Sequence, residues 1–225
     1  THTHTHAHTD THTRTHARQS MPIGMDELGR AKSAAEVRAL LKDADVRATD
    51  EVGRTAAHYA AQNGHRKVLD LLLAAGAGPN ARARPDSCTP AHIAAQQNHA
   101  ECLDALAANG ADLNATRAID GHTALASAAQ NGDDAFVAAM VEAGADLNMR
   151  PESSTRRILY TPLMLAFMKG HNAVASTLCQ AGADLYATSS NGNAALHAER
   201  GEQRDEARVG HVRAAREVQL LERRQ

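Results

Sequence analysis

The sequence has few aromatic residues and no tryptophan, and it lacks other features that define large protein classes. Phe, Tyr and Trp together make up 2% of the 225 residues. A single large globular core, or a base-stacking surface for single-stranded nucleic acid, is therefore not expected. No apolar run approaches the ~18–20 residues of a membrane-spanning helix. Lys and Arg total 24 against 26 Asp and Glu, a net charge of −2. That balance favours neither nucleic acid nor a membrane as partner.

Cysteine is also scarce, and catalytic motifs are missing. The three cysteines form no Cys-x-x-Cys pair and stand at Cys88, Cys102 and Cys179. An odd count without a signal peptide predicts reduced thiols and an intracellular location, cytoplasmic or nuclear. Neither a Gly-x-x-x-x-Gly-Lys phosphate loop nor a Gly-x-Ser-x-Gly nucleophile motif occurs. We therefore expect no enzymatic activity and no cofactor.

The sequence does contain a repeat. One glycine column has spacings of 34, 34 and 38 residues, at Gly76, Gly110, Gly144 and Gly182. A threonine column keeps the same spacing, at Thr55, Thr89, Thr123 and Thr161. Two independent columns with one period predict an array of stacked structural units.

Each column predicts a local structure. The threonines precede short apolar runs and are expected to cap the first helix of each unit. A third column contains only Gly or Asn, which suits a left-handed turn after that helix: Gly64, Asn98, Gly132 and Gly170. The second helix carries an apolar stripe that begins as Val68, Leu69, Leu72 and Leu73. Such a small unit must bury this stripe against its neighbours.

These motifs resemble a known repeat. Residues 53–65 read Gly-Arg-Thr-Ala-Ala-His-Tyr-Ala-Ala-Gln-Asn-Gly-His, and residues 68–77 read Val-Leu-Asp-Leu-Leu-Leu-Ala-Ala-Gly-Ala. At almost every position they resemble the ankyrin repeat, and Thr-Pro-Ala-His-Ile-Ala-Ala at residues 89–95 is similar to the same consensus. The resemblance covers residues 25–225. It implies an all-α solenoid of stacked helix-turn-helix repeats with β-turn fingers.

The resemblance also predicts domain boundaries. Residues 1–24 are expected to be a disordered Thr/His tail, and residues 25–49 an N-terminal capping repeat. Four ankyrin repeats span residues 50–190. Residues 191–225 are expected to form a degenerate C-terminal capping repeat with an extended charged helix, because seven extra residues lengthen its first helix.

Histidine is abundant, with 14 residues, and permits two interpretations. The family uses its histidine columns for backbone hydrogen bonds between repeats, which predicts a structural role for His58 and His92. In the N-terminal tract, alternating His2, His4, His6 and His8 could hold a divalent ion. The tract also fits a translated dinucleotide repeat upstream of a start at Met21 or Met25, or a presequence. We predict no metal site.

The resemblance implies that partners bind along the turn tips and the exposed face of the first helices. Candidate positions are those that neither cap a helix nor fill the core. They are Arg54, Gln62, Gln96, His122, Gln130, Arg156, Arg157, Ile158, Tyr160 and Met168. The fourth finger is four residues longer than the others and holds four of these ten.

The sequence therefore predicts a monomeric, non-enzymatic adaptor that binds another protein. Arginines on the turn side, such as Arg82, Arg84 and Arg117, favour a partner with an acidic segment. A regulatory or substrate-recruiting subunit of a ubiquitin ligase or proteasome assembly is the alternative, since ankyrin arrays also occur there.

Overall fold

The computed structural model describes residues 35, 38–39, 45–149 and 160–188. Within these ranges it contains eight α-helices arranged in four pairs, and no strand. The pairs are α3 (Ala56–Gln62) with α4 (Arg66–Ala74), α5 (Pro90–Gln96) with α6 (Ala100–Ala108), α7 (Ala124–Asn131) with α8 (Asp134–Glu142), and α9 (Pro162–Lys169) with α10 (Asn172–Gln180). The all-α repeat fold expected from the sequence is confirmed.

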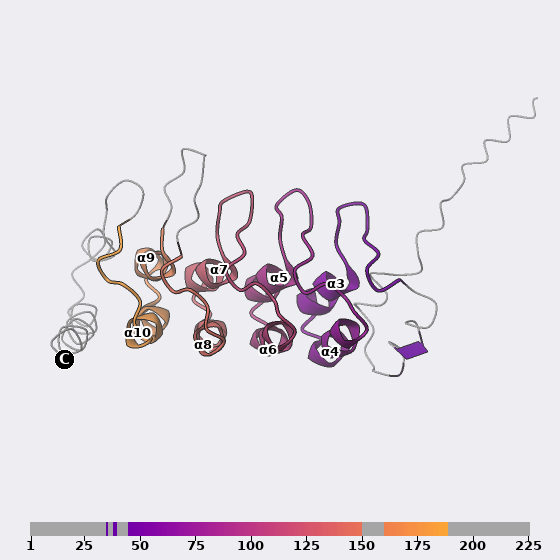
Figure 1. The fold of residues 1–225 in the computed structure, drawn as a ribbon. Helices are drawn as coiled ribbons and strands as arrows, with labels where there is room; N and C mark the ends of the chain where they lie inside the picture. The colour runs from indigo at the N-terminus through magenta and orange to yellow at the C-terminus, as the bar shows by residue number, and fades with distance from the viewer. Residues whose placement is uncertain (1–34, 36–37, 40–44, 150–159, 189–225) are drawn as a thin grey trace, which may run out of the picture.

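The helices form two layers along one axis (Figure 1). The first helices, α3, α5, α7 and α9, lie side by side in one layer, and α4, α6, α8 and α10 lie in the other. The connecting loops leave the second layer, pass the first layer and turn back beyond it as fingers (Figure 1). Each pair contacts chiefly the pairs before and after it, which is the geometry of a solenoid.

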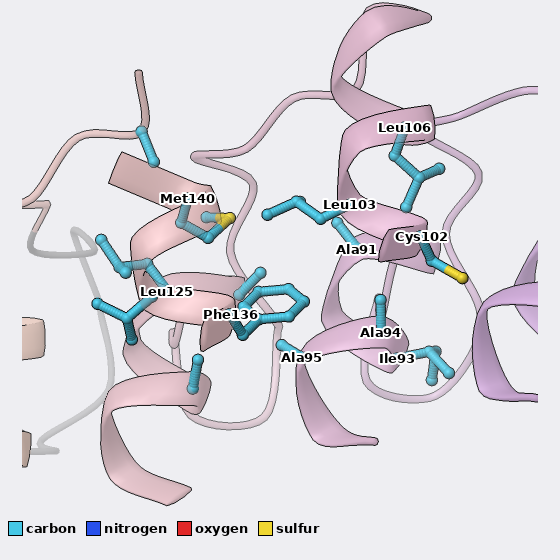
Figure 2. Packing of buried hydrophobic residues seen from close by; sticks show 14 of the residues in the cluster. Ala91, Ile93, Ala94, Ala95, Cys102, Leu103, Leu106, Leu125, Phe136 and Met140 are labelled. Carbon is cyan, nitrogen blue, oxygen red and sulfur yellow. The ribbon is translucent and has the colours of Figure 1, made fainter. Parts of the chain in front are cut away.

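Small side chains line the first layer. Alanines occupy most of its buried positions, and those of α3 are fully buried: Ala56, Ala57, Ala60 and Ala61. An alanine surface lets neighbouring helices approach closely without losing side-chain entropy. In Figure 2 the larger Phe136 ring of α8 points toward Ala95 of the preceding repeat. Because alanine-lined helices lie close together, the core between repeats is filled with few aromatic side chains.

Larger apolar side chains come from the second layer. Leu69 and Leu72 of α4 and Leu103 and Leu106 of α6 have no exposed surface, and Phe136 and Met140 of α8 are equally buried. The predicted apolar stripe is therefore the core face of each second helix. Two of its later positions, Ala107 and Val141, are only half-buried. Truncating a fully buried member such as Leu72 to Ala costs roughly 2–5 kcal/mol.

Threonine caps begin the first helices, in two forms. In α7 and α9 the threonine hydroxyl accepts a backbone N–H directly, from Ala126 at 3.1 Å and from Met164 at 3.3 Å. In α5 a histidine joins the cap, because His92 Nδ1 accepts the Thr89 N–H at 3.3 Å. His92 Nε2 lies 3.1 Å from the His122 carbonyl of the next repeat. His58 makes the same bridge to the Cys88 carbonyl at 3.1 Å, so the structural role predicted for both rings is confirmed.

This hydrogen bonding requires a neutral ring. Because Nε2 faces a carbonyl it must carry the proton, which leaves Nδ1 as an acceptor. Burial lowers the pKa of His92 to about 4, and burial also lowers the pKa of His58.

Left-handed residues end the first helices as predicted. The φ angles are 68° at Gly64, 55° at Asn98, 86° at Gly132 and 79° at Gly170. A Cβ on Gly64 would lie 2.8 Å from the His99 ring of the next repeat, and one on Gly132 would lie 2.5 Å from His171 Nδ1. Asn98 keeps its Cβ, and the residue at the matching place in the next repeat is Asp133 rather than histidine. Glycine is thus required where a histidine ring packs on the turn.

An asparagine ladder joins the loops after the second helices. Asn80 Oδ1 accepts the Asp112 N–H at 2.7 Å, Asn114 Oδ1 the Asp146 N–H at 2.9 Å, and Asn148 Oδ1 the Asp184 N–H at 2.7 Å. Each bond connects two successive repeats. These asparagines therefore have a structural function, and they are unavailable as freely rotating partner contacts.

The predicted tail of residues 1–24 and the C-terminal cap of residues 191–225 lie outside the described residues. The boundary of the N-terminal cap falls largely outside them too. These divisions of the chain stay predictions.

Two glycine substitutions separate backbone strain from the histidine contact. Gly132 and Gly144 both have positive φ, at 86° and 78°, but a Cβ on Gly144 would meet no atom within 4 Å. We expect Gly144→Ala to cost about 1–2 kcal/mol from strain alone. Gly132→Ala should cost about 1 kcal/mol more, because the His171 ring must move away from the Gln130 carbonyl, 3.0 Å from its Nε2. Urea unfolding measures both, and equal losses would contradict the contact.

Acidification should destabilise the fold through His92. Its pKa is about 4 when folded and about 6.5 when unfolded, so the unfolded chain binds more protons between these values. The free energy of unfolding therefore falls as the pH drops from 6.5 to 4, by about 2 kcal/mol at pH 5 from this ring alone. His92→Gln removes the titrating group and should show a smaller change between pH 7.5 and pH 5. Equal changes in both proteins would exclude His92 as the source.

Candidate protein-binding surface

The candidate surface combines the finger tips with the C-terminal ends of the first helices. The first three fingers lie at residues 50–54, 82–88 and 117–122, and successive fingers are joined through their backbones. The Arg84 N–H donates to the Val52 carbonyl at 2.6 Å, and the Ala118 N–H donates to the Asp86 carbonyl at 2.7 Å. The first three fingers therefore form one continuous edge rather than independent loops.

The first finger is held by Asp50. Its carboxylate accepts the N–H groups of Val52 at 3.0 Å and Arg54 at 2.8 Å, and the Tyr59 hydroxyl at 2.8 Å. These bonds fix the turn against helix α3. The predicted contact residue Arg54 lies at the base of this finger and is half-buried. Val52, at the tip, is 43% exposed.

The second finger carries two exposed arginines, Arg82 and Arg84. The Ala83 N–H donates to the Cys88 carbonyl at 2.8 Å, closing a turn of four residues between them. The last residue of that turn, Ser87, has a φ of 55°. Glycine stands at the corresponding place in the first and third fingers, where Gly53 has a φ of 77° and Gly121 of 71°.

The third finger contains a compact charged group. Arg117 Nε donates to Asp120 Oδ1 at 3.2 Å, and its Nη2 forms an ion pair with the other carboxylate oxygen. Asp120 also accepts the His122 N–H at 3.0 Å. Burial opposes ionisation of Asp120, but this hydrogen bond and the charges of His122 and Arg117 outweigh it, so the Asp120 pKa lies below its ordinary value. Arg117 is therefore neutralised locally, and the positive charge expected from it is offset.

The ends of the first helices differ in accessibility. Gln62 and Gln96 are exposed, and their side chains make no hydrogen bond to another described residue. Met168, in the same column, is 41% exposed. Gln130 is half-buried, and its carbonyl accepts from His171 Nε2 at 3.0 Å. Three of the four positions in this column are thus open to a partner.

The remaining candidate positions belong to the fourth finger and the turn column. Tyr160 is half-buried and packs against the core cluster, so it contributes to the stack as well as to the surface. His122 has 16% of its side chain exposed. Arg156, Arg157 and Ile158 lie outside the described residues.

Two further exposed apolar side chains lie at Ile119 and Tyr186, and Tyr186 was not among the predicted contacts. Ile119 at the third finger tip is 53% exposed, and Tyr186 is 45% exposed. Tyr186 occupies the column of Asn80, Asn114 and Asn148. The sequence could have indicated Tyr186 as an exposed candidate, because an aromatic residue replaces asparagine at this position of the repeat. It marks the point where the asparagine ladder ends within the described residues.

Two of the three buried thiols, those of Cys88 and Cys102, are poor nucleophiles. Burial raises the pKa of Cys88, and burial raises the pKa of Cys102 to about 11. Both thiols are therefore protonated at neutral pH. Residues 45–149 and 160–188 hold no group of three or more His, Cys, Asp or Glu side chains that could share a metal ion. In the same ranges no helix combines the length and apolarity needed to cross a bilayer.

The fold defines a helical-repeat solenoid whose finger tips and first-helix ends form one exposed edge. The family model for ankyrin repeats in three copies matches residues 29–83 and 79–151, and the single ankyrin-repeat model matches residues 159–190. The chain belongs to the ankyrin-repeat family. Ankyrin repeats are general protein–protein interaction modules, and proteins built from them are typically non-enzymatic. No curated protein sequence gives a significant match.

Exchanging the second-finger serine for glycine should stabilise the chain. Ser87 adopts a left-handed conformation that costs a residue with a Cβ about 1 kcal/mol. Ser87→Gly should therefore raise the free energy of unfolding by about 0.5–1 kcal/mol, measured by urea titration. The reverse exchange, Gly53→Ser, should lower it, because a Cβ there meets its nearest atom at an ordinary 3.4 Å and adds only strain. A loss of stability in Ser87→Gly would show that the serine makes a stabilising contact.

Proposed function

We propose that this chain is a non-enzymatic adaptor that binds a partner protein along the edge formed by its finger tips and first-helix ends. The proposal rests mainly on the contrast between structural and free positions. Threonine, histidine, glycine and asparagine columns are occupied by caps, turns and links between repeats. Gln62, Gln96 and Met168 are exposed and have no such function.

Exposed apolar groups at the same edge support this choice of face. Val52 and Ile119 lie at finger tips, and Met168 lies at the end of α9. Apolar side chains among polar ones are favourable anchors in protein interfaces. The second-layer helices expose mainly charged residues and alanine, for example Lys67, Glu101 and Ala74.

The charge of the second finger favours a partner with an acidic segment. Arg82 and Arg84 are exposed, and Arg82 donates to the Thr116 carbonyl at 3.3 Å while its side chain stays at the surface. The Arg84 guanidinium has no hydrogen bond to another described residue. Arg156 and Arg157 of the fourth finger would extend this charge. A monomer that exposes such an edge can engage an extended segment across several repeats.

A pair of matched triple variants tests the binding face. In the first, Gln62→Ala, Gln96→Ala and Met168→Ala remove exposed side chains from the first helices. The control, Lys67→Ala, Glu101→Ala and Glu142→Ala, removes exposed side chains from the second helices. We expect the first variant to weaken partner capture at least tenfold, equivalent to about 1.4 kcal/mol, and the control to leave it unchanged.

Partners are identified by affinity purification with mass spectrometry from the native source, and affinity is then measured with the purified partner. Equal affinity of both triple variants and the wild type would exclude this face. Arg157→Glu tests the fourth finger separately, without the loss of core packing that a Tyr160 substitution would cause. Stoichiometric recovery of ubiquitin-ligase or proteasome subunits would instead favour a recruiting subunit over a free adaptor.

A further inference from the structure

The second finger differs from the first and third fingers in its turn, which contains a cis peptide bond between Arg84 and Pro85 and a positive φ angle at Ser87. Its turn ends at Ser87, in a left-handed conformation that glycine adopts in the first and third fingers. A non-glycine residue in such a conformation is unfavourable, and an observed outlier of this kind points to a function for its side chain. The side chain in question is a hydroxyl group.

Ser87 also differs from the other serines in the described ranges. Ser127 is buried and donates to the Thr123 carbonyl at 3.1 Å, and Ser176 accepts from Gln180 Nε2 at 3.4 Å. Ser87 makes no hydrogen bond to another described residue. It stands half-buried at the end of a finger turn, two residues after the exposed Pro85. Among the described residues, its hydroxyl therefore has no hydrogen-bonding role in the fold.

Two exposed arginines precede this serine in the chain, Arg84 three residues before it and Arg82 five residues before it. Charge patterns around the acceptor residue are a principal means by which protein kinases distinguish substrates. Arginines on the N-terminal side of a hydroxyl suit a kinase whose substrate cleft carries carboxylates. Ser127 and Ser176 have no arginine or lysine among the five positions before them.

We propose that Ser87 is a phosphorylation site for an arginine-directed serine/threonine kinase, with ATP as phosphoryl donor. In the reaction, Ser87 Oγ forms a bond to the γ-phosphorus while the bond from that phosphorus to the β,γ-bridging oxygen breaks. The hydroxyl proton passes to the base of the kinase, and ADP leaves. Arg82 and Arg84 place the serine in the kinase cleft.

The phosphate would change the charge of the second finger. Arg82, Arg84 and Asp86 sum to +1 (two arginines and one aspartate). A phosphate adds about −1.5 to −2, so the tip becomes negative. Arg84 and Ser87 are the first and last residues of one four-residue turn, with Cα atoms within about 7 Å, so the phosphate can pair with Arg84. If the partner is acidic, as proposed above, phosphorylation weakens its capture; that consequence rests on the proposed function, whereas the modification itself does not.

The test uses the folded full chain without any partner, Mg²⁺, labelled ATP and a purified arginine-directed kinase. Phosphopeptide mapping by mass spectrometry assigns the site, since Ser33 also follows basic residues, Arg30 and Lys32. We expect one phosphate on Ser87, none there in Ser87→Ala, and at least a tenfold lower kcat/KM in Arg84→Ala. The control Arg66→Ala, which removes an exposed arginine from helix α4, should keep the wild-type rate.

Three results would overturn the proposal. The first is the absence of phosphate on Ser87 in the folded chain while a synthetic peptide of residues 79–90 is phosphorylated, since the finger would then withhold the hydroxyl. The second is an unchanged rate in Arg84→Ala. The third is equally fast phosphorylation of Ser87 by a kinase that selects acidic substrates. Either the second or the third result would show that Arg82 and Arg84 do not direct the kinase to Ser87.

Discussion

Helices of seven to nine residues cannot bury an apolar face within one pair, so each pair here depends on its neighbours for half of its core. This dependence explains why the two layers contribute different side chains to the core. The first layer supplies alanines that allow close approach, and the second supplies Leu, Phe and Met side chains that fill the space between repeats. Stability is therefore a property of interfaces between repeats, and the repeats are not independent domains.

Polar contacts fix how far each repeat is rotated and displaced relative to the next. His58 and His92 bridge the first three repeats through backbone carbonyls, and His171 bridges the third and fourth at a different level. Repeats three and four have Ala126 and Met164 where the cap histidine stands earlier. Their threonines cap the helix directly, so the helix start survives while that bridge is lost. Along the chain, the cap-histidine bridge between the first repeats is thus replaced by the His171 bridge between the third and fourth repeats.

The sequence predicted the features that recur and missed those that depend on a neighbour. Column spacing located the helix starts, the left-handed turns and the buried stripes, because a repeated backbone geometry demands the same residue type each time. It could not show that the Arg117 charge is offset by Asp120, or that Tyr160 packs on the core, since both depend on side-chain approach. Nor did the glycine pattern reveal that Ser87 takes a glycine conformation, because its finger has no glycine to mark the turn.

The coupling between Gly132 and His171 shows how structural columns restrict the surface. A histidine ring occupies the space beside the turn, so the turn must be glycine, and the adjacent Gln130 carbonyl is taken as well. At Asn98 no such ring is present, and a side chain is tolerated beside the exposed Gln96 and Gln97. Surface residues are therefore most free to differ in identity, and so to recognise a partner, where no histidine ring links the turn to the next repeat. By this reasoning the second repeat, with its open turn, two exposed glutamines and arginine-bearing finger, offers the least constrained part of the binding edge.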